Sequence, residues 1–164
     1  MTASTAPRVG TTPEIKTPML AFLRGLHERW LQEVRDVVLP AMQADGVWMR
    51  WRAIEYLGTG FTRRFQRERE AVASLHGHLT SAQAGHLWAA SELLTHLLGR
   101  LDHGIGLCHR TEEFTRLTMS VLNALEYWCQ ETEEALGAVR WGEVPADSRH
   151  LFEVISDGDL AHGC

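Results

Sequence analysis

Apolar residues recur at helical spacing in four successive segments of this chain, and short clusters of Gly, Thr, Ser and Asp separate the segments. The first segment shows the pattern, with apolar side chains at Phe22, Leu23, Leu26, Trp30, Val34, Val37 and Val38. This spacing gathers apolar side chains on one face of a helix. Because the connections are short, consecutive helices are expected to lie antiparallel. The pattern therefore predicts an all-α fold, an antiparallel up-down-up-down four-helix bundle.

Capping and stop residues set the expected limits of the first helix. Thr17 is a suitable N-cap, and Pro18 fits the first helical position, where its missing N–H costs no hydrogen bond. Pro40 is expected to kink or end this helix near the preceding residue, and Asp45-Gly46 is a stop signal.

The second helix is expected from Val47 to His76, with an interruption at Gly58-Thr59-Gly60. Two glycines in a helix interior together cost about 2 kcal/mol of helix propensity. We therefore expect a kink, a break or a close backbone approach at this place.

The last two helices follow turns that contain good capping residues. Thr80 or Ser81 is expected to cap the third helix, which ends near His103. Thr111 is expected to cap the fourth helix, and the two glutamates that follow it suit the positive end of the helix dipole.

The two ends of the chain differ from the bundle between them. Residues 1–16 are rich in Thr, Pro and Ala, without a hydrophobic signal core, and predict a disordered leader. The bundle is expected over 17–142. The C-terminal tail, 143–164, contains a short apolar patch at 151–155 that predicts a short helix packed across the end of the bundle.

Composition places the chain among ordinary soluble proteins of one domain. It has 164 residues, 45% of them hydrophobic, and a net charge of -5, so it has no overall attraction for nucleic acid or anionic lipid. Lys16 is the single lysine, a bias typical of a GC-rich bacterial genome. Cys108, Cys129 and Cys164 form no paired motif, which favours a reduced, cytoplasmic setting. No apolar run is long enough to cross a membrane.

Nine histidines make a metal site worth testing against the sequence. A di-iron bundle needs Glu-x-x-His on two helices, and this motif is absent. His96 and His103 share a helix face with Glu92 and Trp88, opposite the leucine stripe of the third helix, so a solvent-facing or partner-facing stripe is favoured over a metal site. His27 is expected to be a hydrogen-bonded histidine at the edge of the core. The sequence does not decide whether a metal is bound, and no motif for nucleophilic catalysis is present.

Charge is divided between the second and the fourth helix. Six arginines lie between Arg50 and Arg69, and six glutamates lie between Glu112 and Glu134. These helices are diagonal in the predicted bundle, so the opposite charges would face opposite sides. Such a surface suits self-association or a charged partner, although ordinary solvated faces explain it equally well.

Aromatic residues suggest further contacts. The arginines lie near Trp48, Trp51, Phe61 and Phe65, a combination that could hold a nucleic-acid backbone inside a larger assembly. Trp88 and Trp141 lie off the apolar seams, and exposed tryptophans favour interfaces or ligand pockets. Burial in or beside the core is the alternative for both.

Residues 77–91 resemble part of a known helical cap. The stretch reads Gly77-His78-Leu79-Thr80-Ser81-Ala82-Gln83-Ala84-Gly85-His86-Leu87, followed by Trp88 and Ala89-Ala90-Ser91. It is similar to the cap of cobalamin-binding regulators of the MerR type, in which a histidine at the position of His86 covers the cofactor. The resemblance implies a helical bundle and a cobalamin contact at His86. Leu75 and Gly85 stand where the family has Trp and Glu, and we do not expect the cobalamin domain that follows this cap in the family.

Together these observations favour a non-enzymatic helical-bundle interaction protein, either a regulatory or adaptor protein or a small subunit of a larger complex, with self-association expected. The expected partner-binding residues are Arg63, Arg64, Arg67, Trp88, Glu92, His96 and His103. One alternative is a bundle that binds haem, iron or cobalamin as a sensor or redox protein. Another is a small subunit of a ribonucleoprotein complex. The sequence does not identify a cofactor.

Overall fold

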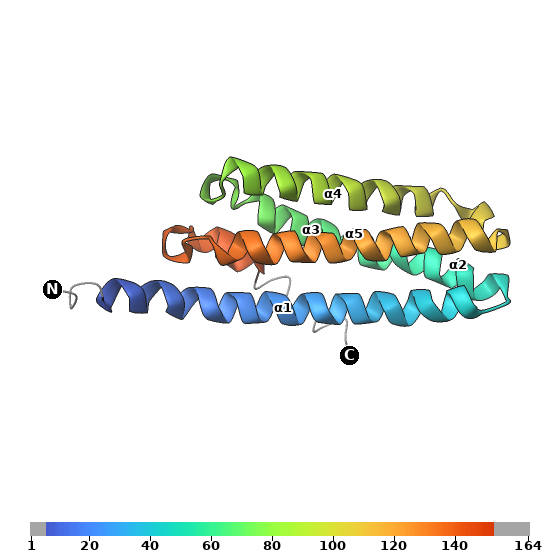
Figure 1. Ribbon diagram of the computed structural model, residues 1–164, viewed down its shortest axis with the longest axis horizontal. Coiled ribbons are helices and arrows are strands. Elements are labelled where there is room, and N and C mark those ends of the chain that lie inside the picture. The colour runs from blue at the N-terminus through green and yellow to red at the C-terminus, as the bar shows by residue number, and fades with distance from the viewer. Residues whose placement is uncertain (1–5, 153–164) are drawn as a thin grey trace.

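The computed structural model describes residues 6–152, with side chains described from Leu20 onward except at position 105. This part of the chain is helical and contains no β-strand, which confirms the all-α prediction. Five α-helices lie side by side along the long axis of the molecule (Figure 1). They are α1 (Ala6–Gln43), α2 (Val47–Glu55), α3 (Thr62–Ala73), α4 (Ser81–Asp102) and α5 (Thr111–Gly137).

Short helical turns join the α-helices. A π-helix, η2 (Tyr56–Phe61), connects α2 to α3, and three 3₁₀ turns follow at η3 (His76–His78), η4 (Ile105–His109) and η5 (Trp141–Glu143). Residues 146–152 form a further helical segment in the C-terminal tail. Helix α1 packs against α2 and α5, and α4 packs against α5 and η2.

The glycine pair in the second predicted helix coincides with η2. A Cβ on Gly58 would lie 3.3 Å from Asp102 Oδ1 and 3.8 Å from Asp102 Cα, so the backbone passes close to the end of α4. Inside the wider π turn, the Thr62 hydroxyl donates to the Leu57 carbonyl at 2.7 Å. The expected close backbone approach is therefore present, and the chain continues as a helix through it.

The limits of α1 differ from those expected. The helix begins at Ala6 rather than at Thr17 and Pro18, so it covers most of the segment for which we expected a disordered leader. Pro40 does not end it, because Pro40 lies in the last turn and the helix continues to Gln43. The Ala44 N–H donates to the Pro40 carbonyl at 3.0 Å before the chain turns at Asp45-Gly46, as predicted.

Capping was predicted correctly for one of the last two helices. Thr80 caps α4 in a reciprocal pair with Gln83: the Gln83 N–H donates to Thr80 Oγ1 at 3.1 Å, and the Thr80 N–H donates to Gln83 Oε1 at 2.9 Å. The cap position of α5 is Arg110, with no side-chain cap bond, and Thr111 is its first helical residue.

Aromatic side chains fill the core between the helices. Trp30 meets the edge of Phe61 with ring centres 6.0 Å apart, and Phe65 meets Trp128 in the same way at 5.3 Å. Such edge-to-face pairs add to the stabilisation that area burial supplies.

Trp141 is buried, which is one of the two alternatives that the sequence left open for it. Its indole N–H donates to the Leu136 carbonyl at 3.2 Å, and its ring contacts Phe152 edge-on with centres 5.8 Å apart. Residues 146–152 are helical and Phe152 is buried, whereas residues 153–164, which include the rest of the apolar patch predicted to form a short helix, lie outside the described range.

None of the helices between residues 6 and 152 combines the length and the apolar character needed to span a lipid bilayer.

Candidate functional site

The predicted polar stripe of α4 points outward. Trp88 is 67% exposed, and Glu92, His96 and His103 are also exposed. The leucines of the opposite face, Leu94, Leu97, Leu98 and Leu101, are buried. The structure therefore brings four of the expected contact residues together on one face of one helix.

The expected arginine contacts have different environments. Arg63 and Arg67 are exposed on α3. Arg64 is partly covered and forms an ion pair with Glu33 of α1 at 2.5 Å. Arg69 of α3 forms an ion pair with Glu92 of α4 at 2.9 Å. Two of the expected partner-binding residues, Arg64 and Glu92, therefore already form ion pairs within the chain.

Arg50 is a structural residue rather than part of a basic surface. It is buried, and its Nε–H donates to the Cys108 carbonyl at 2.7 Å while Nη1 donates to the Ala44 carbonyl at 3.1 Å. These bonds join the turn after α1 to η4. From the sequence, Arg50 was included among the arginines of a basic surface, and its buried role was not predicted.

The aromatic residues near the arginines also divide. Phe61 and Phe65 are buried in the core and cannot contact a nucleic acid. Trp48 is 63% exposed and stacks on Trp51 with ring centres 5.1 Å apart. Only this tryptophan pair at the start of α2 is left of the aromatic set proposed for nucleic-acid contact.

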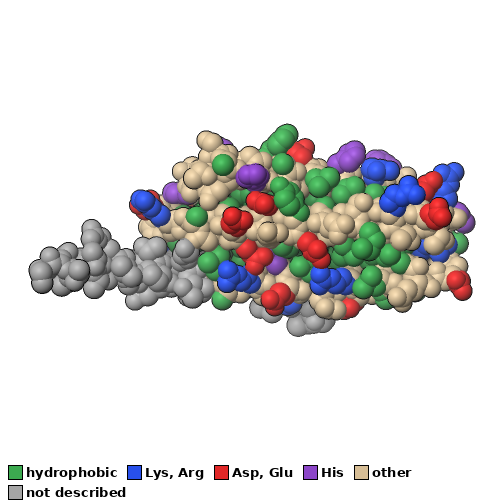
Figure 2. Space-filling model, in the orientation of Figure 1, with side chains coloured by type: hydrophobic (Ala, Val, Ile, Leu, Met, Phe, Trp, Pro, Cys, Tyr) green, Lys and Arg blue, Asp and Glu red, His purple; other side chains and the backbone are tan. Residues whose placement is uncertain are grey.

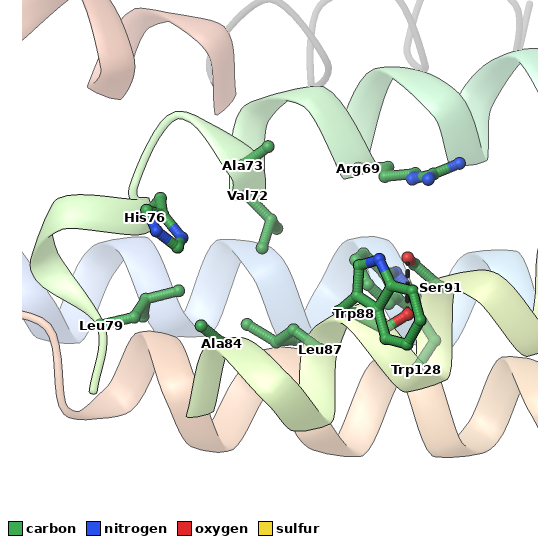
Figure 3. A pocket seen from close by; sticks show the side chains of 10 residues that line it. All are labelled: Arg69, Val72, Ala73, His76, Leu79, Ala84, Leu87, Trp88, Ser91 and Trp128. Atoms are coloured by element: carbon green, nitrogen blue, oxygen red, sulfur yellow. Dashed lines mark hydrogen bonds between the residues drawn. The ribbon is translucent and has the colours of Figure 1, made fainter. Parts of the chain in front are cut away.

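An apolar pocket of about 220 Å³ opens beside Trp88 (Figure 3). Helices α3, α4 and α5 and the turn η3 contribute its walls, which consist of Val72, Ala73, Leu79, Ala84 and Leu87 with Arg69, His76 and Ser91. Trp128 is 1% exposed and therefore lies at the base, while the exposed Trp88 lies at the mouth. The pocket exists where small side chains, Ala73, Ala84 and Ser91, meet between helices.

A buried charged cluster lies behind this pocket. The Nε2–H of His27 donates to Glu68 Oε1 at 2.5 Å, and the Trp128 indole N–H donates to the same oxygen at 3.1 Å. His27 Nδ1 lies 3.3 Å from Glu133 Oε2. The cluster therefore joins α1, α3 and α5, and Trp128 belongs both to it and to the pocket.

The cluster keeps His27 charged. Burial alone would lower the pKa of His27. The Glu68 carboxylate overcomes that effect, and hydrogen bonds to Cys129 and Glu133 add to it, so the pKa of the imidazole rises to about 12. The structure thus contains a buried ion pair rather than the boundary histidine expected from the sequence.

Two oxygens in this region are buried without a hydrogen-bond partner, Glu68 Oε2 and Thr132 Oγ1. His27 is 1% exposed and Glu68 0%, so solvent and substrates do not reach the ion pair. Burial raises the pKa of the neighbouring Cys129 thiol, which keeps it in the unreactive protonated form. The cluster therefore joins three helices inside the core, out of reach of solvent.

The described residues offer little support for a metal or cofactor site. Among the side chains that the structure describes, no three of His, Cys, Asp or Glu are grouped so that they could hold an ion. His86 is exposed and is not among the residues that line the pocket. A cobalamin contact at His86 stays a prediction.

Comparison with known proteins found no match: no family model, no curated protein and no solved structure is similar to this chain. Function must therefore be argued from the residues and their arrangement.

Proposed function

We propose that this chain is a non-enzymatic helical protein that acts through protein contacts, and that α4 carries its contact surface. The observation that supports the proposal most strongly is Trp88, which is 67% exposed at the mouth of an apolar pocket. Tryptophan is enriched among the residues that dominate binding energy at interfaces. An exposed indole beside an open apolar recess offers both halves of such a contact.

The surroundings of Trp88 suit a protein interface. Interfaces have an apolar centre and a polar rim. Here Trp88 and the pocket supply the centre, and Arg69, Glu92 and His96 supply charged or polar groups beside it. Arg63 and Arg67 lie on the neighbouring helix α3 and extend the rim in the proposal.

We further propose that the helices form an up-down-up-down four-helix bundle, in which α2, η2 and α3 together form the second helix of the bundle. Ion pairs along the edges support this order of neighbours: Arg64–Glu33 joins α3 to α1, Arg69–Glu92 joins α3 to α4, and Arg35–Glu126 joins α1 to α5. The alternating course of the chain in Figure 1 supports it too. This arrangement leaves α4 with one long face away from the core.

The test is capture of partners from an extract of the native host with immobilised wild type, Trp88→Ala and Trp48→Ala. Trp48 is a matched control because it is 63% exposed, close to the 67% of Trp88, and lies on α2. We expect wild type and Trp48→Ala to retain the same proteins and Trp88→Ala to lose them. Circular dichroism checks that all three are folded. Equal capture by Trp88→Ala would exclude α4 as the contact surface.

The two other functions have less support among the described residues. A ribonucleoprotein subunit would use Arg63 and Arg67 without the buried Phe61 and Phe65. A haem, iron or cobalamin protein would have to bind through exposed histidines such as His86. An absorption spectrum and metal analysis of protein from the native host would test the second of these.

A further inference from the structure

We propose that the pocket beside Trp88 receives Trp88 of a second copy of this chain, so that two copies form a two-fold symmetric dimer through α3 and α4. The inference rests on the proposed function and names its partner. Each copy then supplies one projecting indole and one recess.

The size of the pocket selects the kind of occupant. Sites for drug-sized molecules and cofactors have volumes of about 300–1,000 Å³. This pocket measures about 220 Å³. A cavity of about 150 Å³ accommodates a benzene ring. The pocket therefore has room for one aromatic side chain rather than for a cofactor.

The walls select the same occupant. Val72, Leu79 and Leu87 present aliphatic surface, and the ring of Trp128 closes the base (Figure 3). An indole gains from burial against such walls and from ring contact with Trp128. Its N–H also has Ser91 and His76 nearby as polar groups of the lining.

The position of the projecting side chain favours a second copy over a different protein. Trp88 itself lines the pocket, so the projection and the recess lie next to each other on one face. A two-fold axis pairs the same patch of both subunits, and each group meets its complement in the other copy. One face that carries both halves of a contact meets this condition.

The charges at the rim satisfy the same condition. Arg69 and Glu92 lie side by side, 2.9 Å apart, next to the pocket. In a two-fold pair, Arg69 of one copy can face Glu92 of the other, and these two residues are of opposite sign. A partner of strongly acidic or basic character would meet unfavourable charge at one of the two residues.

The first experiment is sedimentation equilibrium over a range of protein concentrations. We expect wild type and Trp48→Ala to dimerise with the same Kd, and Trp88→Ala to raise the Kd at least about 100-fold, because the dimer loses two tryptophan anchors. Thermal unfolding of each variant shows whether the fold is retained. A wild type that stays monomeric throughout the range would overturn the proposal, as would a Trp88→Ala protein that dimerises normally.

The second experiment separates a reciprocal contact from any other use of Trp88. Ala84→Leu fills the recess and leaves Trp88 in place, so its homodimer is also expected to weaken at least about 100-fold. In a mixture, Trp88 of the Ala84→Leu copy enters the open recess of the Trp88→Ala copy. We expect a mixed dimer at least about 10-fold tighter than either mutant homodimer. No preference for the mixed dimer would contradict the reciprocal contact.

The two proposals fail in different ways. If wild type is monomeric but Trp88→Ala still loses proteins from the host extract, α4 is a contact surface for a different protein and only the dimer is wrong. If Trp88→Ala changes neither the dimer nor the captured proteins, both proposals are wrong.

Discussion

At the scale of single residues, the buried pair of His27 and Glu68 is the feature that sequence reasoning missed. The signal was present: Phe61, Phe65, Val72 and Leu75 follow three-and-four spacing only if Glu68 occupies the seam between them. Glu68 lies among the arginines of the second predicted helix, and its place in the apolar seam was not used in the prediction. The position of Glu68 in the apolar seam, rather than its charge, determines that its side chain is buried.

Stability should fall as pH rises, because of His27. Its pKa is about 12 in the folded chain against about 6.5 in the unfolded chain, so the folded state binds one more proton between these values. The contribution is complete below pH 6.5 and is lost toward pH 12, with a slope of up to about 1.4 kcal/mol per pH unit. Urea unfolding at several pH values measures it.

The control for this prediction is His27→Gln, in which the slope above neutral pH should largely disappear. The groups that face the imidazole are Glu68 of α3 and Cys129 and Glu133 of α5, and Arg24 of α1 lies 3.5 Å from Glu133. The raised pKa of Cys129 adds a fall of the same sign at alkaline pH. Equal slopes in both proteins would show that His27 is not charged when buried.

Removing one partner of the pair should cost more than removing both. Glu68→Leu leaves the buried His27 cation without its buried anion, with only the partly exposed Glu133 carboxylate 3.3 Å away, and should lower the free energy of unfolding by about 3–5 kcal/mol. The double variant His27→Leu/Glu68→Leu leaves no unpaired charge and should be more stable than Glu68→Leu alone. Urea unfolding of the two variants and wild type tests this order, and a double variant less stable than the single one would contradict it.

At the scale of elements, the close approach at the glycine pair and the Thr80 cap were predicted correctly, whereas the Thr17 and Thr111 caps were not. Gly58-Thr59-Gly60 became a π-helix, and Thr80 formed its cap, because both effects are local to the backbone. Pro40 was expected to kink or end the first helix near the preceding residue, but the helix continues through it to Gln43. The pocket was not predicted, since it depends on which helices meet at Ala73, Ala84 and Ser91.

Two glycines should respond to alanine in opposite directions. A Cβ on Gly60 would have only Tyr56 Cδ2 near it, at 4.0 Å, so Gly60→Ala should stabilise the chain by about 0.5–1 kcal/mol through helix propensity. A Cβ on Gly104 would lie 2.7 Å from Leu107 Cδ1 and 2.9 Å from the Arg100 carbonyl, so Gly104→Ala should destabilise it by about 1–3 kcal/mol. Thermal unfolding measures both, and equal signs would contradict the packing described at Gly104.

At the scale of the whole molecule, the charge asymmetry seen in the sequence is partly cancelled by the fold. Arg35 of α1 pairs with Glu126 of α5 at 2.6 Å, and Arg24 lies 3.5 Å from Glu133, so α1 places arginines against the acidic helix. Acidic and basic side chains are interspersed on the face shown in Figure 2. The helices that carry these charges could be predicted from the sequence, but the oppositely charged side chains that pair with them on other helices could not.

The proposed dimer should therefore depend only weakly on salt. Its contact is an indole in an apolar recess, and exposed charges contribute little once screened. Raising the ionic strength from about 0.1 M to about 1 M, where the Debye length falls from about 10 Å to about 3 Å, should change the Kd by less than about threefold. Sedimentation at both salt concentrations measures this, and dissociation at high salt would favour contacts through the charged helix faces instead.

Arg50 has a consequence for how one end of the molecule moves. Its guanidinium is bound to the carbonyls of Ala44 and Cys108, so neither chain reversal can come apart without leaving a buried cation unsatisfied. In native-state hydrogen exchange, the amides around both reversals should open as one cooperative unit with a shared free energy. Arg50→Met should uncouple them, giving each reversal its own exchange rate and making that end the first to fray.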